Sequence, residues 1–461
     1  MPTATELARR VARALARPVD AAGLAAFRVL FGLTMTFATL RFVFYGWVGE
    51  LLVAPAYHFT YFGFDWVVPF SEPVMLALFG VMALAALCLA LGLFTRVSAA
   101  IFCGLFTYAE LIDKATYLNH YYLASLLALL LVFVPSGSLW SLDASWSARR
   151  GRPANAAVPA LSYWMLRAQV GVVYVFAGLA KLDADWLVRA EPVTTWLRAR
   201  VESPLLTGLA SEPWVPYAMS WAGALFDLFV VPLLLVRTTR PFAVAAALCF
   251  HLAIWLLFPV GVFSFVMLCA ITVFFAPDWP RRYLGHLVRR APLPESGGGT
   301  KPRASTLALA AAYLVVQLGV PLRFLFYPGP VNWTEEGYRF AWRVMLIEKA
   351  GQVEFVVTSA SPPARFHEFP RSELTPLQLR QMATQPDMIA DYARHLRARY
   401  EARGYRDVRV YADAWVSFNG RRSQRFIDPS VDLAALPRSF AHKSWILPLG
   451  TGVVPALAAR R

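Results

Sequence analysis

The fold of this chain is decided by the stretch Val173-Tyr174-Val175-Phe176-Ala177-Gly178-Leu179-Ala180-Lys181-Leu182-Asp183-Ala184-Asp185-Trp186. It places one lysine at the end of a long apolar segment, just before a loop that two aspartates open. Such a lysine either extends its amine to water or stays partly buried as the neutral amine. Most lysines at the end of an apolar segment reach water, so the rest of the sequence must show whether Lys181 differs.

Composition assigns the chain to a class of protein. Of the 461 residues, 58% are hydrophobic and only 16% are charged, and the mean hydropathy is +0.49. These values are far from those of a soluble domain, so we expect an integral membrane protein. The net charge of +15 comes from short arginine clusters between apolar runs. Such clusters are typical of topology signals and of contacts with anionic lipid, and we expect no nucleic-acid partner.

The four cysteines lie inside apolar segments without the short spacing of metal ligands. We therefore expect buried thiols, no disulfide framework and no metal site.

The apolar runs predict about nine membrane spans, because a helix of about twenty apolar residues crosses a bilayer. The predicted spans are residues 23–47, 73–94, 97–112, 119–135, 162–181, 215–236, 241–257, 261–276 and 305–325. The pair 241–257 and 261–276 is separated only by Pro259-Val260-Gly261, so a re-entrant hairpin is the alternative there.

Arginine distribution predicts the orientation, because cytoplasmic loops carry an excess of Lys and Arg. Residues 1–20 are arginine-rich and amphipathic, which predicts an interfacial helix at the inner membrane surface. Arginines recur in every second connection, including a cytoplasmic linker at 277–304, whereas residues 48–72 carry no Lys or Arg. The loop after Lys181 is an exception, with three arginines among acidic residues. The pattern predicts a cytoplasmic N-terminus and a C-terminal region outside.

The composition changes after the last predicted span. Residues 351–359, 408–419 and 425–427 have the pattern of strands, with Asn419-Gly420 as a hairpin turn, and residues 377–403 have helical periodicity. We therefore predict a polytopic α-helical membrane bundle at 21–325, followed by a small α+β extracytoplasmic domain at 326–461.

This topology brings ionisable residues to one membrane face. Lys181 ends the fifth predicted span and His120 begins the fourth, so both lie at the outer boundary, near Asp113 and Asn119. Ionisable groups at such depths are costly and tend to be functional. From the sequence pattern alone, however, the favoured interpretation of His120 is a residue that caps the start of its span through backbone hydrogen bonds.

Several motifs in one order resemble the vitamin K-dependent γ-glutamyl carboxylases, in a bacterial form with an HTTM-type membrane domain. They are Asp113 to Leu123, Ala177 to Trp186, Phe250-His251, Phe263 to Met267, Pro277 to Arg281, Asn332 to Trp342, Asp413 to Asn419 and Arg425 to Pro429. The resemblance covers nearly the whole chain. It implies a protein of the bacterial inner membrane. This sequence departs from the pattern at His395, where the animal enzymes have a disulfide cysteine, so no covalent tie is expected there.

The resemblance implies a reaction. The lysine matching Lys181 deprotonates reduced vitamin K, here menaquinol, and the oxygenated quinone then removes a γ-proton from a peptidyl glutamate. The carbanion adds to CO2, and the quinone leaves as its epoxide after consuming O2. By the same likeness His120 assists the carbanion or carboxylation step, and Asn119 positions the quinone. A greasy quinol arrives from the lipid membrane and a glutamate-containing peptide from water, so both meet at a membrane boundary.

The remaining candidates each have a structural alternative. His251, together with Tyr174, is either part of the quinone pocket or a hydrogen-bonded core residue. A group of four, Asn332, Trp333, Tyr338 and Trp342, either lines the glutamate groove or folds the outer domain onto the bundle. Asp183 and Asp185 either cap the next segment or hold Lys181 charged. Trp186 is expected at the lipid interface rather than stacked on the quinone.

Two other functions remain open from the sequence. The first alternative is a quinol epoxidase without protein carboxylation, and the second is a non-enzymatic membrane receptor or scaffold on the same fold.

Overall fold

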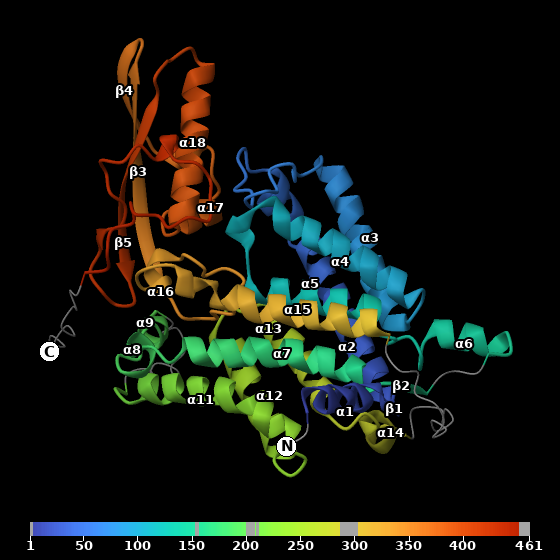
Figure 1. Ribbon diagram of the computed structural model, residues 1–461. Helices are drawn as coiled ribbons and strands as arrows, with labels where there is room; N and C mark the ends of the chain where they lie inside the picture. Colours follow the sequence, from blue (N-terminus) through green and yellow to red (C-terminus); the bar gives the residue numbers. More distant parts are fainter. Residues whose placement is uncertain (1–2, 153–155, 200–207, 209–211, 286–302, 451–461) are drawn as a thin grey trace.

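The computed structural model describes residues 3–152, 156–199, 208, 212–285 and 303–450. Figure 1 shows a helical bundle with a sheet-containing domain at one side of it. The bundle buries one apolar core and the sheet domain buries another, to which Phe59 and Ala115 from the bundle connections also contribute.

The bundle contains seven helices that are long and apolar enough to cross a membrane, among the described residues. They are α2 Ala22–Phe44, α3 Glu72–Leu91, α4 Thr95–Ile112, α7 Ala160–Ala180, α11 Val215–Leu235, α12 Arg240–Leu257 and α15 Ala304–Leu322. The two other predicted segments form shorter helices, α5 Asn119–Phe133 and α13 Phe263–Ile271. All nine predicted segments are thus helical, and the number that crosses the membrane stays a prediction.

Close helix packing explains how the core of the bundle is built. A Cβ added to Gly32 of α2 would lie 2.6 Å from the backbone nitrogen of Ala90 in α3, so only glycine permits this approach. Between the long helices lie α6 Leu142–Arg149, α8 Ala184–Leu187, α9 Val193–Arg198 and α14 Trp279–Tyr283. Most of the predicted linker 277–304 lies outside the described residues.

The N-terminal segment is a helix followed by a strand. Helix α1, Ala4–Ala16, begins with a capping box formed by Thr3 and Glu6. Strand β1, Pro18–Asp20, pairs antiparallel with β2, Ala157–Pro159. The prediction of one interfacial segment over 1–20 missed this strand, because Pro18 does not continue a helix.

The outer domain is an antiparallel sheet in the order β4-β3-β5-β6. Its strands are β3 Lys349–Ala360, β4 Pro363–Glu368, β5 Arg409–Phe418 and β6 Gln424–Arg425, and its helices are α16 Val331–Thr334, α17 Pro376–Met382 and α18 Pro386–Ala402. Helix α18 packs on β3 and β5. The sequence predicted three of the four strands but only one helix over 377–403, where Pro386 starts a second helix.

Ion pairs and aromatic contacts join the outer domain to the bundle. Lys114, directly after α4, pairs with Asp387 at 2.9 Å and with Asp391, both from α18. The Tyr57 ring lies 4.4 Å from the ring of His395, and the Tyr57 hydroxyl donates to the Asp391 carbonyl at 3.3 Å. His395 stands where the animal enzymes have a disulfide cysteine. It therefore contacts the rest of the chain by packing against Tyr57.

Candidate functional site

Lys181 is buried at the end of α7 and forms an ion pair with Asp227 of α11. The two charged atoms, Nζ and Oδ2, are 2.7 Å apart, and the side chains are only 5% and 8% exposed. Nζ also donates weakly to the carbonyls of Ala177 and Val344, both at 3.4 Å. Lys181 is therefore buried and does not extend its amine to water.

Trp186 packs beside this pair. Nζ of Lys181 lies 5.2 Å from the centre of the Trp186 ring, and the Trp186 indole donates to the Ser220 carbonyl at 2.7 Å. With 5% exposure the ring is inside the protein. The predicted interfacial anchor is therefore wrong, because α8 turns the ring back onto α11 instead of toward lipid.

The two aspartates after Lys181 act elsewhere. Asp183 accepts from the backbone nitrogen of Asp185 and caps α8. Asp185 accepts two hydrogen bonds of 2.7 Å from Arg421 of the outer domain. Burial opposes the ionisation of Asp185, but these bonds and the Arg421 charge outweigh it and hold the pKa below its usual range. Of the two predicted roles, capping therefore applies to Asp183. Asp185 instead links α8 to the outer domain.

A mainly apolar cavity opens beside the Lys181–Asp227 pair. Tyr174 and His251 line it, and the Tyr174 hydroxyl is hydrogen-bonded to His251 Nε2 at 2.7 Å. The His251 Nδ1 atom is buried and has no hydrogen-bond partner among the described residues. The other aromatic lining residues are Trp186, Trp196, Phe250, Phe258 and Phe263. The cavity thus combines one amine, one carboxyl and one unused imidazole nitrogen with flat apolar walls.

His120 packs against Phe263, a residue that lines this cavity. Its ring packs against Phe263 with 5.7 Å between the centres, and Phe263 in turn lies 5.8 Å from the His251 ring. The neighbouring Asn119 donates to the Arg343 carbonyl at 3.2 Å and accepts from the Tyr117 hydroxyl at 3.0 Å. The structure brings His120 near the cavity through Phe263, while Asn119 holds the segment that covers it.

The segment that covers the cavity comprises residues 335–345 and contains Tyr338 and Trp342, two of the predicted site residues. Tyr338 donates to the Arg343 carbonyl at 3.1 Å, and the buried Trp342 stacks on Tyr122 of α5 with 5.0 Å between the ring centres. Four of its residues other than glycine have positive φ angles, namely Glu335, Phe340, Trp342 and Met345. Such backbone is strained and clusters at functional sites. The segment passes directly over Lys181, whose amine meets the Val344 carbonyl.

Asn332 and Trp333 lie farther into the outer domain. Asn332 accepts from Arg343 at 3.2 Å. The Trp333 ring is fully buried against Phe418 and Phe426. Trp333 therefore occupies the core of the outer domain, a position that favours the folding role over direct contact with a substrate.

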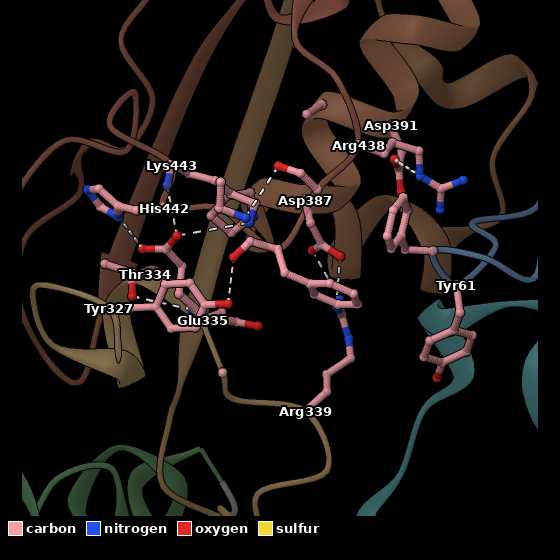
Figure 2. A pocket seen from close by; sticks show the side chains of 18 of the residues that line it. Tyr61, Tyr327, Thr334, Glu335, Arg339, Asp387, Asp391, Arg438, His442 and Lys443 are labelled. Atoms are coloured by element: carbon pink, nitrogen blue, oxygen red, sulfur yellow. Dashed lines mark hydrogen bonds and ion pairs between the residues drawn. The ribbon is translucent and has the colours of Figure 1, made fainter. Parts of the chain in front are cut away.

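A second, larger cavity of about 640 Å³ lies between the bundle and the outer domain. Figure 2 shows its charged side chains arranged around the opening, with Arg339 and Asp387 facing each other and His442 and Lys443 gathered on another side. Its basic lining residues are Lys114, Arg323, Arg339, Arg394, Arg438 and Lys443, and its acidic lining residues are Glu335, Glu336, Asp387 and Asp391. The described lining therefore has an excess of positive charge. The outer cavity is lined by Glu335, Glu336, Gly337, Arg339 and Phe340 of the covering segment, and the inner one by Val344 and Met345.

Asp227 is the functional candidate that sequence reasoning missed. It stands alone in Ala224-Leu225-Phe226-Asp227-Leu228-Phe229, inside an apolar run. A single carboxylate within a span is itself a signal of function, but the sequence does not say which residue it faces.

Two family models match the chain. The model of the HTTM domain matches residues 16–279, and the model of the lumenal domain of vitamin K-dependent gamma-carboxylase matches residues 302–452. The first contains the Lys181–Asp227 pair and the second contains the covering segment. No solved structure matches the chain.

Proposed function

The chain belongs to the vitamin K-dependent gamma-carboxylase family, and from this premise we propose that it carboxylates peptidyl glutamate with a reduced quinol, O2 and CO2. Members of this family use reduced vitamin K and act on glutamate-containing protein substrates. In the proposed reaction a γ C–H bond of glutamate is replaced by a bond to CO2. The quinol accepts one oxygen atom from O2 and leaves as the epoxide, and the other oxygen atom leaves as water.

The observation that carries the proposal is the Lys181–Asp227 pair at the wall of an apolar cavity. A lysine must be neutral before it accepts a proton. The Asp227 Oδ2 atom lies 2.7 Å from Nζ, so this carboxylate is placed to take the proton that Lys181 must give up. We assign Lys181 as the base that deprotonates the quinol and Asp227 as the residue that orients the amine and exchanges its proton.

The residues of the inner cavity fit a flat quinol. Aromatic side chains line it, and His251 offers a buried Nδ1 that no described residue uses. Tyr174 fixes the other nitrogen of the same ring. Once bound and oxygenated, the quinol supplies a base strong enough to remove a glutamate γ-proton. Menaquinol is the form proposed here, because a bacterial inner membrane contains it.

The peptide reaches the site from the other direction. The outer cavity faces the covering segment, and its excess of positive charge suits a glutamate-containing chain. Tyr338 and Trp342 line neither cavity, and their part in this proposal is to hold the segment that lies between the two. We propose that the outer domain lies outside the cell and the N-terminus in the cytoplasm, so that the peptide enters from water while the quinol enters from lipid.

His120 and the covering segment protect the reaction. The segment covers Lys181 and keeps water from the strong base and the carbanion. The Phe263 ring lies between His120 and His251, and we propose that His120 assists the carboxylation step from this position at the edge of the inner cavity. Asn119 holds the segment in register through the Arg343 carbonyl.

The first test supplies purified protein with reduced menaquinone, O2, labelled bicarbonate and a glutamate-containing peptide. We expect quinone epoxide and labelled γ-carboxyglutamate in the same reaction. Epoxide without label, even with peptides released from the native cell envelope, contradicts carboxylation. The absence of both products contradicts the quinol chemistry.

A further inference from the structure

A third cavity, of about 40 Å³, lies within the membrane bundle. Its charged lining residues are Arg41 of α2 and Glu110 of α4, and Tyr121 of α5 adds a phenol. Nearly all other lining side chains are apolar: Ala38, Phe42, Leu52, Phe79, Met82, Phe106, Ala109 and Val262, besides the hydroxyls of Thr39 and Thr116. The cavity is thus a small apolar space with few polar groups.

The polar groups of this cavity are only partly satisfied. Arg41 Nε is buried and has no hydrogen-bond partner among the described residues. The guanidinium group lies over the Trp47 ring at 5.0 Å and interacts with the Tyr121 hydroxyl. Glu110 accepts a hydrogen bond from Ser125. Arg41 is half-buried in the last turn of α2, and its covered Nε is a costly unused donor that a ligand would satisfy.

The cavity borders the proposed carboxylation site. Tyr121 and Val262 line it, and the residues next to them in sequence, His120 and Phe263, pack against each other with 5.7 Å between their ring centres. Phe263 also lines the inner cavity that contains Lys181. The pairs His120-Tyr121 and Val262-Phe263 therefore form a shared wall between the two spaces.

We infer that this third cavity binds carbon dioxide and delivers it across the wall to the carbanion, an inference that rests on the proposed carboxylation. The volume exceeds the ~10–15 Å³ that one water needs and is far below the ~150 Å³ of cavities that take benzene. An occupant of two or three heavy atoms fits. Carbon dioxide is apolar as a whole and reaches the cavity through lipid, while its partly negative oxygens accept hydrogen bonds.

The polar groups discriminate between the small molecules of the reaction. Dioxygen has no charged ends that gain from a guanidinium donor. Water needs two to four polar partners, which the polar side chains of this lining can supply, so water is the competing occupant and a missing carbon dioxide band assigns the space to it. Carbon dioxide gains from both the apolar walls and the Arg41 donor, so it is the co-substrate that this lining favours.

Infrared spectroscopy tests binding without depending on catalysis. Purified protein under carbon dioxide is expected to show an antisymmetric-stretch band distinct from that of the dissolved gas. Ala109→Leu fills the cavity and is expected to remove the band, whereas Ala77→Leu on the exposed face of α3 retains it. Arg41→Met, which removes the donor and leaves the walls, is expected to weaken and shift the band. A band unchanged in Ala109→Leu overturns the inference, as does the absence of any bound band in the wild-type protein.

Kinetics provide the second readout. With carbonic anhydrase keeping CO2 and bicarbonate in equilibrium, Ala109→Leu is expected to raise the KM for CO2 several-fold, while Ala77→Leu leaves it unchanged. Epoxide formation reports the quinol step separately, since it consumes O2 but not CO2. A parallel rise in the KM for O2 overturns the assignment to carbon dioxide. A protein without epoxidation refutes the proposed function, and the infrared band still decides whether the cavity binds carbon dioxide.

Discussion

Two buried lysines of this chain are held in opposite ways. Lys181 has one carboxylate partner, Asp227, and lies at the wall of an apolar cavity inside the bundle. Lys114 has two carboxylate partners, Asp387 and Asp391, at the junction of the bundle with the outer domain. Burial alone therefore does not distinguish a reactive lysine from a structural one; the number of compensating charges and the presence of an adjacent apolar space do.

The guanidinium groups around each lysine reinforce the difference. Arg339 pairs with Asp387 at 2.7 Å, and Arg394 and Arg438 pair with Asp391. The Lys114 network thus joins two carboxylates to one ammonium and three guanidinium groups. Among the described residues no arginine forms an ion pair with Asp227, whose ion-pair partner is Lys181. A proton can move within that isolated pair, whereas the Lys114 network serves as a rigid connection.

The largest expected effect separates the two lysines by function. Lys181→Ala is expected to abolish quinone epoxidation, since removal of a general base costs about 10²–10⁴ in rate and no other described amine lines the inner cavity. Lys114→Met is expected to retain epoxidation while lowering the free energy of unfolding by about 3 kcal/mol, the lower end for a broken buried pair, because the arginines still neutralise the two aspartates. Epoxide assays and thermal unfolding measure both variants.

A folded Lys181→Ala protein that still forms epoxide contradicts the assignment of the base. Loss of epoxidation in a folded Lys114→Met protein would remove the distinction between the two lysines.

The partners of the lysines give the next largest effect. Asp227→Asn keeps the hydrogen bond to Lys181 but removes the proton acceptor, so we expect the epoxidation rate to fall roughly 10- to 100-fold and its pH dependence to change. Asp387→Asn is the matched change in the Lys114 network and is expected to affect stability instead. Equal loss of epoxidation in both variants would indicate a general effect of removing buried charge.

A smaller effect is expected at Gly178, which sits three residues before Lys181. A Cβ at this position would lie 2.9 Å from the backbone nitrogen of Leu228, the neighbour of Asp227. Gly178→Ala therefore pushes α7 away from α11 and lengthens the Lys181–Asp227 contact. We expect a several-fold loss of epoxidation with about 1–3 kcal/mol of destabilisation. Gly104→Ala, where a Cβ meets nothing within 4 Å, is the control.

The sequence predicted the parts of the fold that depend on local pattern. Apolar run lengths located the nine apolar helices that the structure describes in the bundle, and alternating residues located β3 and β5, because both signals are periodic along the chain. Strand β4 was missed because it begins at Pro363 and lies at the edge of the sheet, where proline is tolerated and the buried face is weak. The break at Pro386 was overlooked although proline commonly starts a helix.

The site was predicted only in part, for a different reason. Lys181 stands out because a lysine ends an apolar span, but its partner Asp227 lies 46 residues later on a neighbouring helix. No local pattern specifies which faces of α7 and α11 meet. The burial of Trp186 and the fold of residues 335–345 over Lys181 likewise depend on contacts between distant segments.

The smallest expected effect is the acid response of the Lys114 network. Burial opposes ionisation of Asp387, but the charges of Arg339 and Lys114 outweigh it and hold its pKa well below the usual range. A depressed carboxyl stabilises the fold fully above its unfolded pKa of about 3.9, and this contribution is lost as pH falls toward the folded value. The free energy of unfolding of the protein should therefore decline below about pH 4, by at most about 1.4 kcal/mol per pH unit for this one group. Asp387→Asn should make the decline shallower because an amide does not titrate, and an unchanged slope in that variant would show that other carboxylates set the acid limit.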